Sequence, residues 1–438
     1  MANTIETYGD SAVMAAFLTR DFSSVGGEFE DSMITTLKNY AFAGITNLRR
    51  LSLPSITIIP TCAFYLTEIS GTVTIPWSNI TKIGSAAFYG GNALKESSLS
   101  LPVLRQIGSR AFMEQSDLTS FSAPALEEII AENTPFEEFG GAFEGSGLQT
   151  FSAPILQATS NAQQLFKNCV SLTSVTMPNQ TVVAASMFEG CTSLKSISLP
   201  RAIYCTGDYG FRNCSALTSV SLPTVQSVTA NYLFYGCSSL EDISLPEAQG
   251  NAGMYLFSQC SALKTVSLPK ITALSSSCFR GCTSLTFVGL NIPLVTSLGS
   301  SCFQECTALT TFSSNSISYI GSSCFSDCAN LENVAFSGVT AVPQNCFYNC
   351  QKLTEVEFSG AVVSFGDAAF RGCRLLDTII LSGVTTVPTI SSDTFRSATL
   401  ITNGLGSIYV PDGLVSAFQA DSIWGLYNIE GMSDYAGQ

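Results

Sequence analysis

FRNCSALTSVSLP, residues Phe211 to Pro223, is the stretch of this sequence that decides the predicted fold. Counted from the phenylalanine, a cysteine stands at position +3, leucines at +6 and +11, a valine at +9 and a proline at +12. The second half, LTSVSLP, alternates small polar with branched apolar residues, as a short strand with one buried face does. The proline ends the strand because it has no amide to donate. We therefore expect Val220 and Leu222 to face a core.

The same pattern recurs along most of the chain, each time around one phenylalanine. Neighbouring members of this set lie 22 to 25 residues apart, except for one interval of 31 residues. Such a period predicts a repeat architecture in which each unit forms one coil that packs on the next. A second apolar pair before the following phenylalanine, such as Val295 and Leu298, is expected to form the returning wall of a coil. The repeat phenylalanines are Phe42, Phe64, Phe88, Phe112, Phe143, Phe166, Phe188, Phe211, Phe234, Phe257, Phe279, Phe303, Phe325, Phe347, Phe370 and Phe395.

Two segments show the full unit, IGSRAFMEQSDLTSFSAP from Ile107 and IGSSCFSDCANLENVAF from Ile320. From about Thr35 to Leu400 the chain resembles the BspA-like leucine-rich repeats, whose unit reads roughly I-G-x-x-A-F-x-x-C-x-x-L-x-x-V-x-L-P. The resemblance implies a curved leucine-rich repeat solenoid with one short strand per coil and otherwise irregular structure. It also implies binding rather than catalysis, because such repeats occur in bacterial surface proteins, adhesins and phage-associated proteins.

Small caps are expected at both ends of the array, because the end coils would otherwise expose apolar faces and strand edges. We expect an N-terminal cap over residues 1–34, about sixteen repeats over 35–403 and a C-terminal cap over 404–438. In the last segment, Asp412 is expected to cap a short helix that carries Leu414, Phe418 and Trp424 onto the final coil.

The charge balance restricts the partners. Nineteen Lys and Arg residues against 33 Asp and Glu give a net charge of −14, which disfavours nucleic acid and anionic membrane surfaces. No run of 18 apolar residues predicts membrane insertion, and the first residues lack a secretory signal. We expect either an extracellular or cell-surface protein whose signal was removed, or a virion-associated one. The virion-associated alternative is compatible with 16 cysteines, because a virion protein is made in the cytosol, which keeps thiols reduced.

Fourteen of the cysteines fall into two columns, one at +3 and one directly before the repeat phenylalanine. We favour packing of these side chains as small apolar groups, with disulfides or a metal site as alternatives. Cys62 and Cys205 lie outside the columns and are expected to be the more reactive thiols. The columns contain Cys169, Cys191, Cys214, Cys237, Cys260, Cys282, Cys306, Cys328, Cys350 and Cys373 at +3, and Cys278, Cys302, Cys324 and Cys346 before the phenylalanine.

Nothing in the sequence predicts an active site. The chain has no histidine, which removes the commonest general base, and it has no GxSxG, P-loop or dinucleotide-binding motif. We therefore expect that the protein is not an enzyme, and that it has no catalytic residue, no metal site and no cofactor. A polysaccharide-active enzyme with paired carboxylates remains a remote alternative.

The first candidate for binding is the outward side of the strands, at positions +8 and +10. We call the side chains at these positions the hydroxyl rows and expect them to bind a protein or glycan. The alternative is that they are ordinary polar residues, which any soluble solenoid needs on its solvent face. Towards the C-terminus Phe287, Asn333, Glu355 and Glu357 replace the hydroxyls. The rows are Ser120, Ser122, Ser174, Thr176, Ser196, Ser198, Ser219, Ser221, Asp242, Ser244, Thr265 and Ser267.

Two further candidates lie outside the rows. The long interval after Phe112 contains an acidic insertion with Glu132, Glu137 and Glu138, expected to be a solvated bulge, a docking loop or, less favoured, a calcium site. A group of tyrosines is expected to form either an aromatic recognition edge or a packing contact between coils. This group is Tyr204 and Tyr209, with Tyr232, Tyr235 and Tyr255 on nearby coils.

Overall fold

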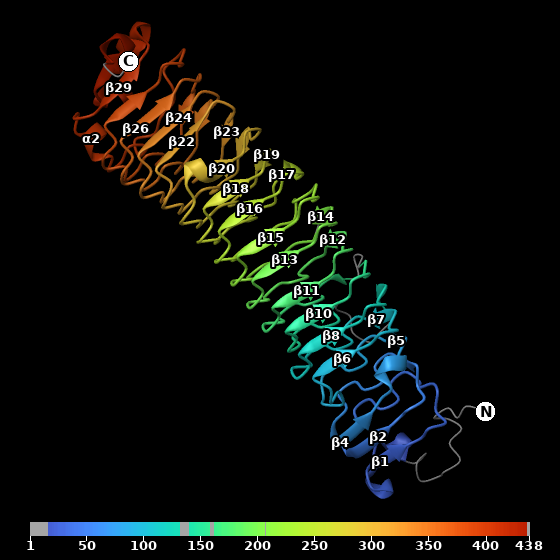
Figure 1. Cartoon of the computed structure of the whole chain (residues 1–438). Coiled ribbons are helices and arrows are strands. Elements are labelled where there is room, and N and C mark those ends of the chain that lie inside the picture. The colour runs from blue at the N-terminus through green and yellow to red at the C-terminus, as the bar shows by residue number, and fades with distance from the viewer. Residues whose placement is uncertain (1–15, 132–139, 158–161, 206, 436–438) are drawn as a thin grey trace. The chain divides into compact units, whose positions relative to one another are not determined.

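The computed structural model describes residues 16–131, 140–157, 162–205 and 207–435. The chain divides into two compact units, Met1–Leu222 and Pro223–Gln438, which we call the first and second unit. Within each unit, successive repeats form successive coils, and strands of neighbouring coils lie side by side (Figure 1). The predicted repeat solenoid is confirmed.

The first unit contains two sets of parallel strands. One set continues the predicted strand of each repeat: β1 (Glu28–Glu30), β2 (Leu48–Ser52), β4 (Ile69–Thr74), β6 (Ser98–Ser100), β8 (Ser120–Ser122), β10 (Thr150–Ser152), β11 (Ser174–Thr176), β13 (Ser196–Ser198) and β15 (Ser219–Ser221). The other set lies in the returning wall: β3 (Ile58–Ile59), β5 (Lys82–Ile83), β7 (Gln106–Gly108), β9 (Glu128–Ile130), β12 (Val182–Val183) and β14 (Tyr204–Cys205). The 3₁₀ helices are η2 (Ser23–Val25) and η3 (Trp77–Asn79).

The second unit repeats this arrangement. Its front strands are β16 (Asp242–Ser244), β18 (Thr265–Ser267), β20 (Leu290–Asn291), β22 (Thr311–Ser314), β24 (Asn333–Phe336), β26 (Glu355–Phe358), β28 (Thr378–Ile380), β29 (Ser407–Val410) and β30 (Ile429–Gly431). Its returning strands are β17 (Gln249–Asn251), β19 (Lys270–Leu274), β21 (Ser297–Leu298), β23 (Tyr319–Ile320), β25 (Ala341–Val342) and β27 (Ser364–Phe365). The helices are η5 (Phe287–Gly289), α2 (Thr399–Thr402), η6 (Asp412–Leu414), α3 (Val415–Ala420), η7 (Trp424–Leu426) and η8 (Met432–Asp434).

The returning strands are an addition to the expected single strand per coil. Val295 and Leu298, which the sequence placed in the returning wall, are both fully buried. Leu298 belongs to β21, which pairs in parallel with β19 and β23. The wall is therefore hydrogen-bonded as well as apolar.

The repeat phenylalanines form the centre of the core. All of them are at most 1% exposed. Within each unit, neighbouring rings stack with their centroids 5.0 to 5.9 Å apart. Offset stacking of this kind adds to the burial of large apolar surface.

The turn around each repeat phenylalanine uses backbone conformations that the sequence pattern did not reveal. In most coils the residues two before and two after the phenylalanine have positive φ, as Tyr232 (57°) and Gly236 (71°) do around Phe234. The amides of these two residues donate to the next coil, to the carbonyl oxygens of Met254 and Ser258. Left-handed backbone is unfavourable for a non-glycine residue such as Tyr232, so this ladder of hydrogen bonds holds it in place.

The last segment closes the second unit. β29 and β30 extend the front sheet beyond β28, and Phe418 and Trp424 are buried as expected. The indole Nε1 of Trp424 donates to the carbonyl oxygen of Pro388 (2.7 Å). The expected role of Asp412 is wrong, because its carboxylate accepts from the amide and hydroxyl of Ser433 in η8 and caps neither η6 nor α3.

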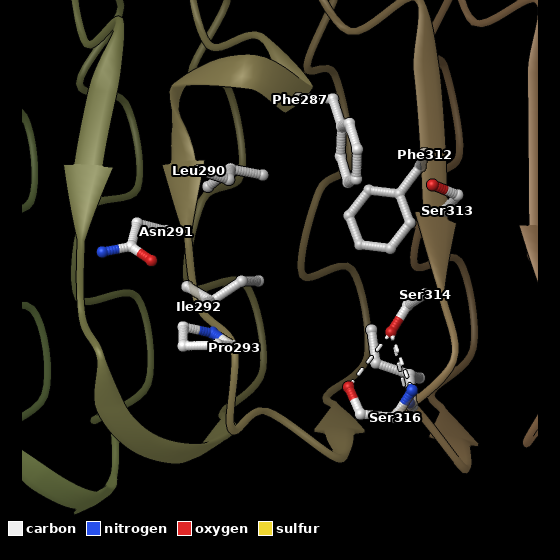
Figure 2. A pocket seen from close by; sticks show the side chains of 10 residues that line it. Phe287, Leu290, Asn291, Ile292, Pro293, Phe312, Ser313, Ser314 and Ser316 are labelled. Atoms are coloured by element: carbon white, nitrogen blue, oxygen red, sulfur yellow. Dashed lines mark hydrogen bonds between the residues drawn. The ribbon is translucent and has the colours of Figure 1, made fainter.

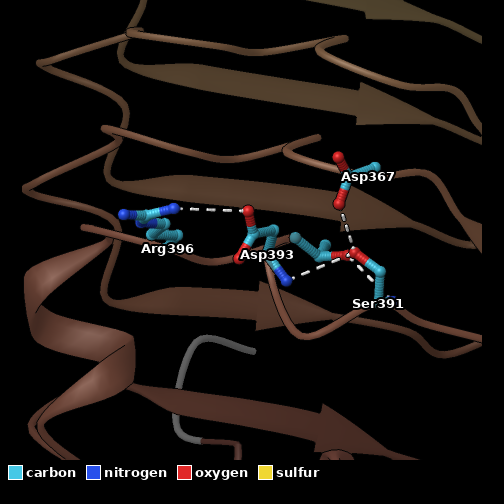
Figure 3. A network of polar contacts seen from close by, with 5 residues as sticks. Asp367, Ser391, Asp393 and Arg396 are labelled. Atoms are coloured by element: carbon cyan, nitrogen blue, oxygen red, sulfur yellow. Dashed lines mark hydrogen bonds and ion pairs between the residues drawn. The ribbon is translucent and has the colours of Figure 1, made fainter.

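Polar contacts also tie the last repeat to the coil before it. The hydroxyl of Ser391 donates to Asp367 (2.7 Å) and accepts from the amide of Asp393 (3.3 Å), as Figure 3 shows. Arg396 lies 3.5 Å from the Asp393 carboxylate. Thr394, fully buried, donates to the carbonyl oxygen of Gly366 (3.2 Å). These contacts fix the turn that carries Phe395 onto the core.

Candidate functional site

The structure brings the hydroxyl rows together on the outer side of the front strands. In the first unit, Ser196 and Ser198 lie in register with Ser219 and Ser221, and all four are exposed. Ser174 and Thr176 are likewise exposed and pair with Thr150 and Ser152. In the second unit the register is Asp242 with Thr265 and Ser244 with Ser267.

Neighbouring row residues bond to one another at several places. The Thr150 hydroxyl donates to the Ser120 hydroxyl (3.0 Å), the Asn291 amide donates to the Ser267 hydroxyl (2.9 Å), and the Thr265 hydroxyl donates to Asp242. A hydroxyl both donates and accepts, and a carboxylate accepts several bonds, so these groups retain capacity for a ligand. The rows offer closely spaced, mainly uncharged hydrogen-bonding groups.

The row is interrupted at the coil of Phe279, and here the expectation for Phe287 is wrong. Counting from the repeat phenylalanine places Phe287 in the row and Val288 in the core. In the structure, Phe287–Gly289 form η5, and Leu290 and Asn291 pair with Val266 and Ser267. The register is therefore shifted by two residues, and Val288 is 96% exposed.

Two recesses lie at this interruption. The first encloses about 230 Å³ between β20 and β22 and is lined mainly by apolar side chains, among them Phe287, Ile292 and Phe312 (Figure 2). The second, of about 480 Å³, lies over β16 and β18 and is lined by Asp242, Ser244, Thr265 and Ser267 among others. Asn291 lines both recesses, so they are adjacent. The sequence signal for them was the Phe279–Phe303 spacing together with an aromatic residue at +8.

Beyond the interruption the outer row becomes acidic, as the sequence indicated. Asn333 of β24 pairs with Glu355 of β26 at position +8, and Glu357 at position +10 pairs with Ala335. Burial and the nearby Glu355 and Glu357 carboxylates raise the pKa of Tyr435. This end of the second unit therefore offers a ligand carboxylates and an amide rather than hydroxyls.

The tyrosines of the predicted edge fall in both units. In the first unit Tyr204 lies in β14 and is 46% exposed, whereas Tyr209 is half-buried with the Arg212 guanidinium 5.1 Å from its ring centroid. In the second unit the rings of Tyr232 and Tyr255 stack 4.5 Å apart and are half-buried. The second pair thus packs between coils, while Tyr204 stays available.

With this geometry in view, comparison with known proteins identifies the fold family. The sequence model described as BspA type leucine rich repeat region matches residues 19–138, 159–286 and 285–402, in six copies. The chain belongs to the BspA-type leucine-rich repeat family. No curated protein sequence matches it.

Several solved structures resemble this BspA-type protein. A leucine-rich repeat protein from Bacteroides ovatus is 21% identical, with 81% of this chain and 88% of that chain covered and a TM-score of 0.49. A leucine rich cell surface protein from Faecalibacterium prausnitzii is 20% identical, with 75% and 83% covered and a TM-score of 0.33. The pneumococcal vaccine antigen PcpA is 16% identical, with 82% and 85% covered and a TM-score of 0.44.

The cysteine columns of this BspA-type protein are free thiols inside the core. All sixteen cysteines are buried, and none is part of a disulfide. The +3 thiols also do more than fill space, since nine of them lie within hydrogen-bonding distance of the carbonyl oxygen of the repeat phenylalanine one coil earlier. Cys260 to Phe234 and Cys282 to Phe257 are examples, both at 3.1 Å. Thr67 and Gln115 make the same contact in coils without the cysteine.

The expectation that Cys62 and Cys205 are the reactive thiols is wrong. Both are fully buried. Burial raises the pKa of Cys205 to about 12, so the nucleophilic thiolate is disfavoured there as it is in the columns. Position outside a column did not mean exposure, because Cys205 lies in the returning strand β14 with its side chain in the core.

Three remaining observations concern other kinds of site. The acidic insertion with Glu132, Glu137 and Glu138 lies outside the residues that the structure describes. Among the described residues, no group of three or more cysteine, aspartate or glutamate side chains is placed to hold a metal ion. Within the same part of the chain, no helix is both long and apolar enough to cross a membrane.

Proposed function

We propose that this BspA-type protein is a non-enzymatic recognition scaffold that binds a protein or glycan at a bacterial cell surface through the outer rows of its front strands. The observation that supports this most directly is the register of the rows. Ser196 and Ser198 align with Ser219 and Ser221, and Asp242 and Ser244 align with Thr265 and Ser267.

Register matters because parallel pairing places equivalent side chains about 4.8 Å apart on consecutive strands. An extended or repetitive ligand can then make the same hydrogen bond at several coils. The individual bonds are weak, but they add along the array. The core beneath is the same in each of these coils, so the outer residues can differ without a change of fold.

The test inserts charge into the rows. Ser198→Lys, Ser221→Lys and Ser244→Lys together add three cations to exposed strand positions. We expect binding to a glycan array or to a panel of fixed bacterial cells to fall at least tenfold, with the melting temperature nearly unchanged. A matched control is Thr192→Lys, Ser238→Lys and Ser261→Lys, three exposed residues at position +4. Equal loss in both triples, or none in either, contradicts the proposal.

A second triple separates the rows from the acidic insertion. Glu132→Lys, Glu137→Lys and Glu138→Lys change the acidic insertion and leave the residues of the hydroxyl rows as they are. Loss of binding in this triple, with normal binding in the serine triple, would move the site to the loop.

We also propose a second setting, a phage or prophage particle that uses the same rows for host contact. The sixteen free cysteines favour it, because a protein that assembles in a reducing cytosol keeps its thiols unpaired. The test is immunodetection of the protein in purified particles and in the cell envelope fraction. Detection in the envelope alone rejects this setting.

A further inference from the structure

The coil of Phe279 carries a built-in interruption of the recognition face. Its strand β20 is the last of the sheet β16-β18-β20, and the next front sheet begins with β22. The returning strands β19, β21 and β23 nevertheless remain paired through the same coils. The interruption is therefore confined to the outer face.

The turn that creates the interruption is closely packed. A Cβ atom at Gly289 would lie 2.0 Å from the carbonyl oxygen of Lys264, so only glycine fits there. The turn directs Val288 away from the core, and at 96% exposure Val288 is the most exposed large apolar side chain among the described residues. Leu294, after the strand, is 53% exposed. Exposed apolar side chains beside a recess are typical of a protein-binding surface rather than of a solvent face.

The first recess presents apolar walls. Phe287, with its ring 5.3 Å from that of Phe312, stands on one side with Leu290 and Ile292. The recess is seen between these residues and β22 in Figure 2. Two of its three serine hydroxyls are engaged internally, since Ser314 accepts from the amide of Ser316 (3.3 Å), and the Ser316 hydroxyl donates to the carbonyl oxygen of Val295 (3.0 Å). These contacts favour an apolar occupant over a sugar.

The second recess carries one charged side chain among its lining residues, Asp242, together with the hydroxyls of Ser244, Thr265 and Ser267 and the apolar side chain of Val288. The Asp242 carboxylate accepts from Thr265, and its other lone pairs remain for a ligand donor. This carboxylate, in a protein with a net charge of −14, attracts a cationic group.

We infer that the two recesses together bind a short extended segment of a partner protein, with one aliphatic or aromatic side chain in the first recess and a lysine or arginine at Asp242. A volume of about 230 Å³ is below the usual size of a small-molecule site and suits a single side chain. β16 and β20 are two strand spacings apart, so the basic residue lies about three to five positions from the apolar one. This inference rests on the proposed recognition role and assigns one anchor point to it.

A library of random twelve-residue peptides displayed on phage provides the probe. Selection uses the full chain, with counter-selection against Ser313→Trp, which fills the first recess. Ala335→Trp is the matched control, because Ala335 is the register partner of Ser313 on β24 and does not line the recess. We expect the enriched peptides to combine an apolar residue with a nearby basic one. Their affinity should fall at least tenfold in Ser313→Trp and less than twofold in Ala335→Trp.

The charge is tested separately with Asp242→Asn, an exposed substitution that keeps the side-chain shape. Affinity should fall several-fold, and the salt dependence seen with the unchanged protein should largely disappear. The inference is overturned by failure to enrich peptides, by enriched peptides without a basic residue that ignore Asp242→Asn, or by equal effects of the two tryptophans. It is also overturned if Ser313→Trp instead abolishes binding of an oligosaccharide on the array. Because Ser244 lines the second recess, the row test is repeated with Ser198→Lys and Ser221→Lys alone, and the two proposals then fail independently.

Discussion

The coils of Phe257 and Phe279 have the same interior and different faces. Phe279 stacks on Phe257 and on Phe303 at 5.5 and 5.4 Å, and Cys282 and Cys306 both lie 3.1 Å from the preceding phenylalanine carbonyl. On the outer face, however, the valine at +9 is 1% exposed in the first coil and 96% exposed in the second, at Val288. The stacked phenylalanines, thiols and turn amides therefore define a coil, while the front strand can absorb an insertion.

The largest expected effect concerns the shared interior, through its buried thiols. Burial raises the pKa of Cys205, Cys214 and Cys260 to about 12, whereas an unfolded thiol titrates at about 8.5. Between these two pKa values the native state therefore binds more protons than the unfolded state. The contribution of these thiols to the free energy of unfolding is full below about pH 8.5 and is lost as the pH rises towards 12. Each such thiol contributes a loss of about 1.4 kcal/mol per pH unit in this window.

The measurement is the urea midpoint in the presence of reductant at about pH 7.5, 9 and 10.5. We expect a steep fall above about pH 9, and a smaller fall in Cys260→Ala, which removes one titrating thiol. A thiol reagent at neutral pH should react with few cysteines in the native protein and with all sixteen after denaturation. A midpoint unchanged up to about pH 10.5 contradicts the buried thiol columns.

The next effect compares the two coils directly by removing a ring from each. Phe257→Ala and Phe279→Ala should each cost about 3 to 5 kcal/mol, because both delete a fully buried aromatic side chain. Chemical denaturation followed by circular dichroism measures the loss. If Phe279→Ala costs less than half as much as Phe257→Ala, the interior of the interrupted coil is looser than its stacking distances indicate.

Gly289→Ala tests the turn that distinguishes the coils. The added methyl group would overlap the carbonyl oxygen of Lys264, so we expect a loss of about 2 kcal/mol as the turn moves. Gly413→Ala is the control, because no atom lies within 4 Å of a Cβ placed there. Equal stability of the two variants, from thermal melting, would show that η5 is not held by this packing.

Cys260 tests the smaller interior contact that all regular coils share. Cys260→Ala should cost about 1 to 2 kcal/mol, since it leaves a small cavity and removes the donor to the Phe234 carbonyl oxygen. Cys260→Ser should cost less, because the serine hydroxyl keeps a donor for the same carbonyl oxygen. The Thr67 hydroxyl donates to the Phe42 carbonyl oxygen in the same way. A serine variant less stable than the alanine variant would mean that packing alone explains the column.

These comparisons show which parts of the molecule the sequence could predict. The phenylalanines and the serine rows recur at a fixed spacing, and strand alternation places them inside and outside without further information. The left-handed backbone at Tyr232 and the contact from Cys260 to a carbonyl oxygen depend on how one coil lies on the next. The repeat spacing assigns Phe287 and Val288 to the wrong places. A two-residue insertion can be absorbed at any turn of a coil, and the spacing between phenylalanines does not say which turn contains it.

The smallest expected effect on stability belongs to Val288, and it separates a binding residue from a core residue. By its place in the repeat, Val288 corresponds to Val266, whose replacement by aspartate would bury a charge and should unfold the second unit. In the structure, Val288 is exposed, so Val288→Asp should change stability by less than about 0.5 kcal/mol. The same substitution places a second carboxylate in the second recess, beside Asp242, in place of an apolar lining residue, and should strengthen binding of the basic residue of the selected peptides. Melting curves of Val266→Asp and Val288→Asp provide the comparison: if both variants unfold, the valine at 288 lies in the core and the register shift is wrong. If Val288→Asp leaves both stability and peptide binding unchanged, the register shift holds and the basic residue of the peptide does not bind in the second recess.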